Sequence, residues 1–256
     1  MKHIFLAVAL LFSAHLARSA PLGAVVQTWH FDPHTSTVTV TIVNTSQKDI
    51  TAFNLSLKIT YQSGVSEYQL SRDLLNNAVF LERYKGTPNE QSIRQQVGPV
   101  AIPVGGSYDE KIPVQPDFKD FEAVLDVVAF SDKTAEATNA AALGRLVAQR
   151  KATALSIQKA VEIIDGVLAD STVSNPHGEA ATKVQKRLDA WKATVHYDVV
   201  DMDEGELIVI GRDLKNVPAA RGSRSEAEYL KTYIDMKEKE RATWADQAQL
   251  VTGRQP

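Results

Sequence analysis

Apolar and polar residues alternate with a period of two along the first half of the chain, as is typical of strands. Val38, Val40 and Ile42 share one side of a β-branched run over 35–43, and five apolar residues share one side of 53–61. The intervening 44–49 is a polar turn, and residues 71–95 interrupt the pattern, which predicts a long loop with a helical piece. Further strands are predicted over 24–31, 97–104, 108–114 and 121–130.

In the second half the apolar spacing changes to three and four residues, the period of a helix. We expect a helix that begins near Asp132 or Thr134 as N-cap and continues for about seven turns, with Arg150 interrupting its apolar stripe. The stripe consists of Leu143, Val147, Ala154, Ile157, Val161, Ile164 and Leu168.

Two more helices have start signals of their own. Asn175-Pro176 combines an N-cap with a first-turn proline, and Ser225 with Glu228 forms a capping box. Residues 207–210 (LIVI) are predicted to be a short strand or a buried segment. The sequence therefore predicts an α+β protein, with an Ig-like antiparallel β-sandwich over 20–132 and a helical region of about three helices over 133–256.

The first 19 residues have the features of a secretory signal peptide: a short polar start, nine apolar residues and a small-residue site. Cleavage after Ser19 is favoured over Ala20, because it leaves small residues at both positions that the peptidase reads. No later run approaches the roughly 20 apolar residues of a transmembrane helix. We expect a periplasmic or secreted protein without a transmembrane segment.

Composition excludes several classes of function. The chain has 256 residues, no cysteine and a net charge of −3, so a thiol nucleophile and a cysteine metal site are excluded and no basic excess indicates nucleic-acid binding. The lack of cysteine also favours a bacterial envelope protein over an animal extracellular one. Residues 20–132 carry a net charge of −5, whereas residues 133–256 are neutral.

One candidate metal site lies near the N-terminus. His30, Asp32 and His34 alternate along a strand end, which would put all three side chains on one face. Pro33 disturbs the strand and no third histidine completes the set, so a polar strand end with a turn is the favoured interpretation.

A second candidate is an acidic cluster in the helical half, and it is typical of a solvated loop. Four carboxylates within six residues would suit calcium, but the EF-hand spacing fails because Gly205 and Arg212 stand at the wrong positions. The four acidic residues are Asp201, Asp203, Glu204 and Glu206.

Catalytic motifs of the common kinds are absent from the sequence. There is no nucleophile elbow, HExxH pair, phosphate loop or dinucleotide fingerprint, and we expect no cofactor. Paired carboxylates for sugar cleavage stay open, because folding sets their separation. Trp29, Trp191 and Trp244 are candidates for stacking on sugars, although helical spacing favours a core position for the last two.

Residues 38–64 resemble the exported bacterial Ig-like domains of FxLYD type. Asn44, Ser46, Tyr61 and Gly64 match the Asn-x-Ser turn and the aromatic-to-glycine strand end of that family, whereas Gln62 stands where an Asp is usual and the FxLYD string is missing. The resemblance implies a non-catalytic envelope domain.

These observations predict a non-catalytic binding or assembly protein of the bacterial cell envelope whose partner is another envelope protein or a second copy. The apolar stripe listed above is the candidate partner-binding face, with packing on the sandwich as its alternative. The competing hypothesis is a hydrolase or carbohydrate-binding protein whose site forms only in the fold.

Overall fold

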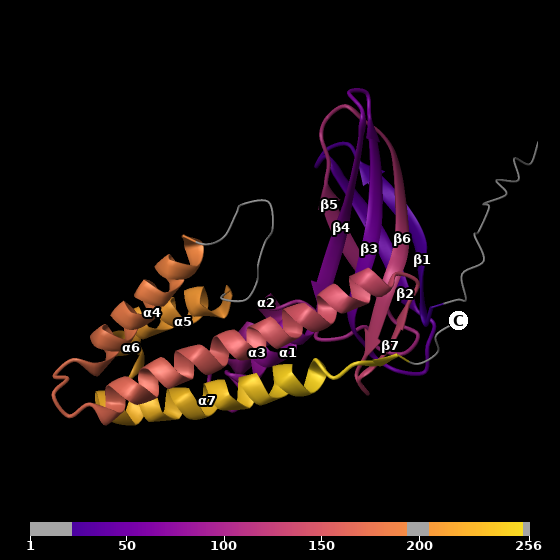
Figure 1. Cartoon of the computed structure of the whole chain (residues 1–256). Helices are drawn as coiled ribbons and strands as arrows, with labels where there is room; N and C mark the ends of the chain where they lie inside the picture. Colours follow the sequence, from indigo (N-terminus) through magenta and orange to yellow (C-terminus); the bar gives the residue numbers. More distant parts are fainter. Residues whose placement is uncertain (1–21, 194–204, 253–256) are drawn as a thin grey trace, which may run out of the picture.

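The computed structural model describes residues 22–193 and 205–252, and this part of the chain has an α+β fold with N-terminal sheets and C-terminal helices (Figure 1). The predicted signal peptide lies outside the described residues. The strands are β1 (Ala24–Asp32), β2 (Thr37–Asn44), β3 (Ile50–Tyr61), β4 (Val65–Asp73), β5 (Ser107–Pro113), β6 (Phe118–Phe130), β7 (Thr134–Ala137) and β8 (Val251–Thr252).

The strands form two sheets with the order β1-β2-β5 and β4-β3-β6-β7-β8. All pairs are antiparallel except β7 with β8. If β1, β2 and β5 take the places of strands A, B and E, then β4, β3, β6 and β7 take those of C′, C, F and G. This is the strand order of an Ig-like sandwich without strand D, so the predicted fold class is confirmed.

The alternation seen in the sequence produces the core between the two sheets. The inward side of β2 consists of Val38, Val40 and Ile42, which are fully buried against apolar residues of β3 and β6. Asn44 is 1% exposed, and its amide donates to the carbonyls of Lys48 and Ile102 at 2.8 Å each. The Asn-x-Ser turn thus closes the sandwich between β2 and β3.

The helices are α1 (Leu75–Glu82), α2 (Glu90–Gln96), α3 (Ala140–Ala169), α4 (Pro176–Lys192), α5 (Gly205–Lys215), α6 (Val217–Ala220) and α7 (Glu226–Gln247). We call α3 to α7 the arm. With 30 residues α3 is about 45 Å long. Figure 1 shows α3 and α7 side by side, with α4, α5 and α6 at the far end and α1 and α2 near the sandwich.

The arm leaves and rejoins the sandwich at the same sheet edge. β7 pairs with β6 immediately before α3, and β8 pairs with β7 immediately after α7. Lys133 reinforces this closure, because its carbonyl accepts from the Val251 amide at 2.9 Å and its ammonium lies 2.8 Å from the Asp246 carboxylate. Residues 134–137, which we had assigned to the helical region, therefore belong to the sheet.

The predicted start of the first long helix is wrong. Asp132 and Thr134 do not cap it, because Thr134 opens β7 and hydrogen-bonds to Asp132 within a turn. The N-cap is Asn139, whose side-chain oxygen accepts from the amides of Ala141 and Ala142 at 3.1 Å each. The caps at Asn175 and Ser225 are confirmed, including the full capping box of α7.

Three other predicted elements change. Residues 97–104 form no strand, and only Ile102 makes an isolated bridge to Ile50. Residues 207–210 lie within α5, where Leu207 and Ile210 are buried and Ile208 is 53% exposed. The helical piece within 71–95 is confirmed as α1 and the start of α2, whereas β4 was not predicted because its residues are mostly polar and exposed.

A buried ion pair joins the arm to the sandwich. Arg150 of α3 is 0% exposed and donates two hydrogen bonds, at 2.7 and 3.0 Å, to the Asp73 carboxylate at the end of β4. It also donates to the carbonyl of Gln247 at the end of α7. Arg150 thus lies at a core position of the helix although its charge interrupts the apolar stripe. We call this three-element contact the joint.

Candidate functional site

The best-formed candidate site is a groove between α1 and α7 near the base of the arm. It encloses about 540 Å³, within the range of about 300–1,000 Å³ that is usual for ligand sites. Its floor is apolar and its rim is charged. The residues that line it are Leu75, Ala78, Val79, Glu82, Arg83, Thr232, Asp235, Met236, Lys239, Glu240 and Thr243.

Buried charges form the inner wall of this groove. Arg83 of α1 donates to the two carboxylate oxygens of Glu240 on α7 at 2.6 and 3.0 Å, and Lys237 donates to the same carboxylate at 2.9 Å. Lys237 is 0% exposed and Glu240 is 6% exposed. A buried lysine is rare unless it is paired, so the carboxylate is what allows this ammonium inside the arm.

The polar contacts continue from α7 to α5. Burial disfavours the Arg83 cation, but the Glu240 carboxylate outweighs burial and raises the pKa of Arg83, and Glu206 adds to this effect. Burial, with help from the Asp213 carboxylate, raises the pKa of Tyr233, whose hydroxyl donates to Asp213 at 3.0 Å. Glu206 is the one member of the predicted acidic cluster that lies within the described residues, and it faces this network.

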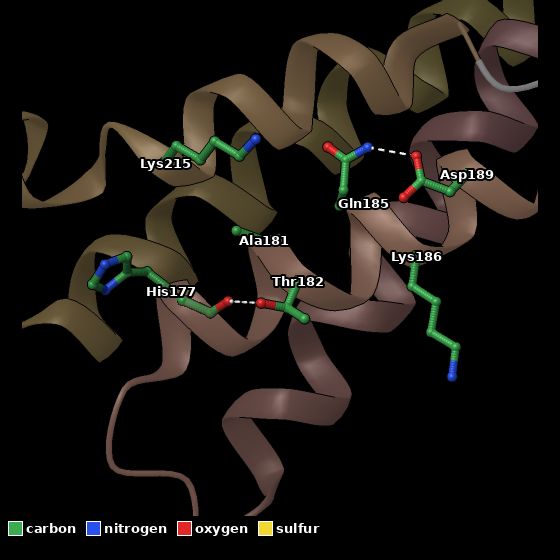
Figure 2. A pocket seen from close by; sticks show the side chains of 8 residues that line it. His177, Ala181, Thr182, Gln185, Lys186, Asp189 and Lys215 are labelled. Carbon is green, nitrogen blue, oxygen red and sulfur yellow. Dashed lines mark hydrogen bonds between the residues drawn. The ribbon is translucent and has the colours of Figure 1, made fainter.

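A second groove lies between α4 and α5 and encloses about 610 Å³ (Figure 2). Its polar groups bind within their own helix: Gln185 donates to Asp189 at 2.8 Å and Thr182 donates to the carbonyl of Gly178 at 2.8 Å. Figure 2 shows Lys186 pointing away from the Gln185–Asp189 pair. This groove therefore has fewer groups aimed at a ligand than the groove between α1 and α7.

The predicted partner-binding stripe lies largely inside the arm. Ile157 and Ile164 are 0% exposed and Val161 is 8% exposed, in one apolar cluster with residues of α1, α4, α5 and α7. Leu143 and Val147 are partly buried near the sandwich end, as is Leu168 at the far end. The stripe is not a free face, because α7 and the helices of the far end cover it within the same chain.

The structure does not bring the predicted metal ligands together. The Asp32 carboxylate turns back to accept from the His34 amide at 2.9 Å and the Thr35 hydroxyl at 2.8 Å, and these bonds lower the pKa of Asp32. His30 and His34 are exposed. Among the described residues no three acidic or histidine side chains are placed to hold a metal ion. Asp201, Asp203 and Glu204 lie outside the described residues.

The tryptophans have three different surroundings. Trp29 is 38% exposed and contacts the rings of Phe118 and Phe121 at centroid distances of 6.2 and 5.7 Å. Trp244 is 4% exposed in the core of the arm, and Trp191 is partly buried against the same cluster. The prediction of a core position is confirmed for Trp244, and no two of these rings form a platform for a sugar.

Sequence reasoning missed the groove between α1 and α7 because its two walls are far apart in the chain. One signal was present: Lys237 and Glu240 continue the three-and-four spacing of the buried residues Leu230, Tyr233 and Trp244. Charged residues at core positions of a helix call for buried partners, and Arg83 is one of them.

No family model, curated protein or solved structure matches this chain. Among the helices in the described part of the chain, none combines the length and the apolar character needed to cross a membrane. The functional conclusion therefore has to come from the residues and geometry described above.

Proposed function

We propose that this chain is an exported, non-catalytic binding or assembly protein of the bacterial cell envelope. It acts through protein–protein contacts, and its groove between α1 and α7 holds an amphipathic helix of a partner protein. The observation that carries this proposal is the combination of an apolar floor and a charged rim at the point where the arm meets the sandwich.

The floor supports an apolar anchor. Leu75 and Val79 of α1 and Met236 of α7 face the groove, while α3 holds the other sides of Leu75 and Val79 in the apolar cluster of the arm. Helix-in-groove recognition uses such a floor for aliphatic side chains spaced three or four residues apart. The rigid backing by α3 keeps the floor open without a rearrangement of the arm.

The rim supports a particular charge pattern on the partner. Asp235 and Lys239 lie one turn apart on α7, and neither has an ion-pair partner within the described residues. Glu82 on the opposite wall is exposed and pairs with Lys85 on its own helix at 2.9 Å. A partner helix that presents a basic residue to Asp235 and an acidic one to Lys239 would complement this rim.

The experiment begins with identification of the helix that occupies the groove. A photo-crosslinking amino acid at position 78 in the floor should capture a defined helical segment of one envelope protein in cells, whereas the same amino acid at position 76 should not, because Asn76 is exposed on the other side of α1. The captured segment is then synthesised as a peptide, and its affinity for the purified chain is measured.

A matched pair of substitutions tests whether the groove is the binding site. Ala78→Arg fills the groove and should weaken the peptide at least about tenfold, whereas Asn76→Arg should leave its affinity unchanged. Equal affinities for the two variants would overturn the proposal, as would crosslinks from position 78 that fall on no common segment. Both variants must retain the thermal stability of the parent protein.

A further inference from the structure

The two sheets have four outer edges, and three of them carry a feature that discourages pairing with another strand. β1 has a register shift between Val26 and Thr28, β5 contains Lys111 and ends at Pro113, and β8 is two residues long. Bulges, lysine, proline and short length are the usual ways in which natural sheets protect an edge.

The fourth edge, β4, has none of these features. It is nine residues long, contains neither lysine nor proline, and pairs with β3 without a register shift. Val65 is 56% exposed and Tyr68 is 40% exposed. Figure 1 shows β4 at the open side of the sandwich, and its outer edge pairs with no other strand in the described part of the chain.

The hydrogen bonds at both ends of β4 fix which backbone groups point outward. The Tyr61 amide donates to the Gly64 carbonyl at 2.7 Å, and the Leu74 amide donates to the Thr51 carbonyl at 2.8 Å. Because bonded and non-bonded pairs alternate in an antiparallel ladder, the even-numbered residues of β4 bond to β3. The amides and carbonyls of Glu67, Gln69 and Ser71 therefore point away from the sheet.

We propose that β4 is a self-association surface, at which the β4 strands of two copies pair antiparallel about a two-fold axis near Gln69. This pairing uses the outward groups of both strands and joins the two five-stranded sheets. The inference rests on the strand edge alone and does not depend on the groove of the arm.

The side chains of β4 complement a second copy of themselves in this register. Tyr68 of one strand lies opposite Leu70 of the other, and such aromatic–aliphatic cross-strand pairs stabilise sheets. Glu67 lies opposite Ser71, so no like charges face each other. Arg72 is already paired with Glu110 of β5, at 2.6 Å from each carboxylate oxygen, and adds no unpaired charge to the interface.

Sedimentation velocity of the full chain over a concentration series tests the proposal. We expect a reversible monomer–dimer equilibrium. Gln69→Pro removes the two central amide donors and should raise the dimer dissociation constant at least about tenfold. Gln69→Ala keeps these donors, and Gln27→Pro places the same residue type in the bulged strand β1, so both should dimerise like the parent. A chain that is monomeric at every concentration overturns the proposal, and so does a dimer that Gln69→Pro leaves intact.

Hydrogen exchange gives a second test that needs no substitution. On dimerisation the amides of Glu67, Gln69 and Ser71 should become protected as the protein concentration rises. The amides of Ser66, Tyr68 and Leu70, which bond to β3, should be protected at every concentration. Protection of the outward amides that does not change with concentration, in a sample that does dimerise, would place the dimer interface elsewhere and refute the proposal.

Discussion

The sandwich and the arm place buried charges in different ways. In the sandwich, Glu110 of β5 is 3% exposed, but its partner Arg72 is 44% exposed at the open side of the two sheets. In the arm, Lys237 and Glu240 are both inside, and at the joint Arg150 and Asp73 are 0% and 3% exposed. Water thus reaches one member of the ion pair in the sandwich but neither member at the joint.

This difference follows from how the two regions are connected. The sandwich is held by backbone ladders between neighbouring strands, so its side chains need only fill the space between sheets. The arm has to fix α3, α7 and α1 relative to a sheet, and each buried pair joins elements distant in sequence: Arg150 with Asp73, and Arg83 with Glu240. A buried pair is a poor source of net stability but tolerates few alternative arrangements. Four variants test the comparison.

The largest effect is expected at the joint. Arg150→Leu keeps the side chain's bulk roughly but leaves the Asp73 carboxylate buried without a cation, which costs about 3–5 kcal/mol. Urea unfolding followed by fluorescence measures this loss. Arg145→Leu, on the exposed side of the same helix, is the control and should cost far less. A loss below about 1 kcal/mol for Arg150→Leu would mean that water reaches Asp73 and that the joint resembles the sandwich pair.

Glu240→Gln should have the next largest effect. It leaves Lys237 buried without a carboxylate and removes the charge that Arg83 faces, at a cost of about 3 kcal/mol. The exposed neighbour Glu238 provides a matched control, since Glu238→Gln should change the unfolding free energy by less than about 0.5 kcal/mol. Adding Lys237→Leu to Glu240→Gln should recover part of the stability. No recovery would show that the loss comes from packing rather than from the unpaired ammonium.

Arg72→Leu should cost less than either arm variant, about 1 kcal/mol by the same unfolding measurement. The Glu110 carboxylate loses its partner, but it lies at the open side of the sandwich, where the removed guanidinium was 44% exposed. Lys58→Leu, at the fully surface pair with Glu122, is the reference for an ordinary exposed ion pair. A loss for Arg72→Leu as large as that for Arg150→Leu would end the distinction between the two regions.

The smallest effect belongs to Asp132, in the turn between β6 and β7. Hydrogen bonds from Lys48 and Thr134 lower the pKa of Asp132 from 3.8 to about 2. A carboxylate with a lowered folded-state pKa stabilises the fold above its unfolded pKa and loses this contribution as the pH falls through the folded value. Asp132→Asn should therefore be slightly less stable than the parent at pH 7, with the difference fading between about pH 4 and pH 2. A difference that persists at pH 2 would assign the effect to the turn's hydrogen bonds instead of its charge.

Sequence reasoning was most successful where one element supplies its own signal. The alternation over 35–43 and 53–61 predicted β2 and β3, and the caps at Asn175 and Ser225 predicted the starts of α4 and α7. It failed for β4, whose polar residues carry no alternation because both of its faces are largely exposed. It also failed for β7, where the sheet recruits residues that resembled a helix start.

The candidate groove could not have been predicted from the chain's pattern. Its walls come from residues more than 150 positions apart, and Arg83 and Glu240 meet across a separation of 157 residues. The stripe on α3 did predict a helix with an apolar side, but the pattern does not say whether that side packs inside the chain or against a partner. Only the positions of α7 and the helices of the far end decide this.

The sequence by itself determined the division into a strand-rich half and a helix-rich half, because hydrophobic period is a local property of each segment. It also determined the turn at Asn44 and the capping box at Ser225, whose hydrogen bonds close within a few residues. The tertiary structure decided that Arg150 and Lys237 lie inside, that β4 is left as an unprotected edge, and that a groove opens beside α1. These features depend on which distant residue supplies the opposite charge or the neighbouring strand, and this is set by the packing of the whole chain.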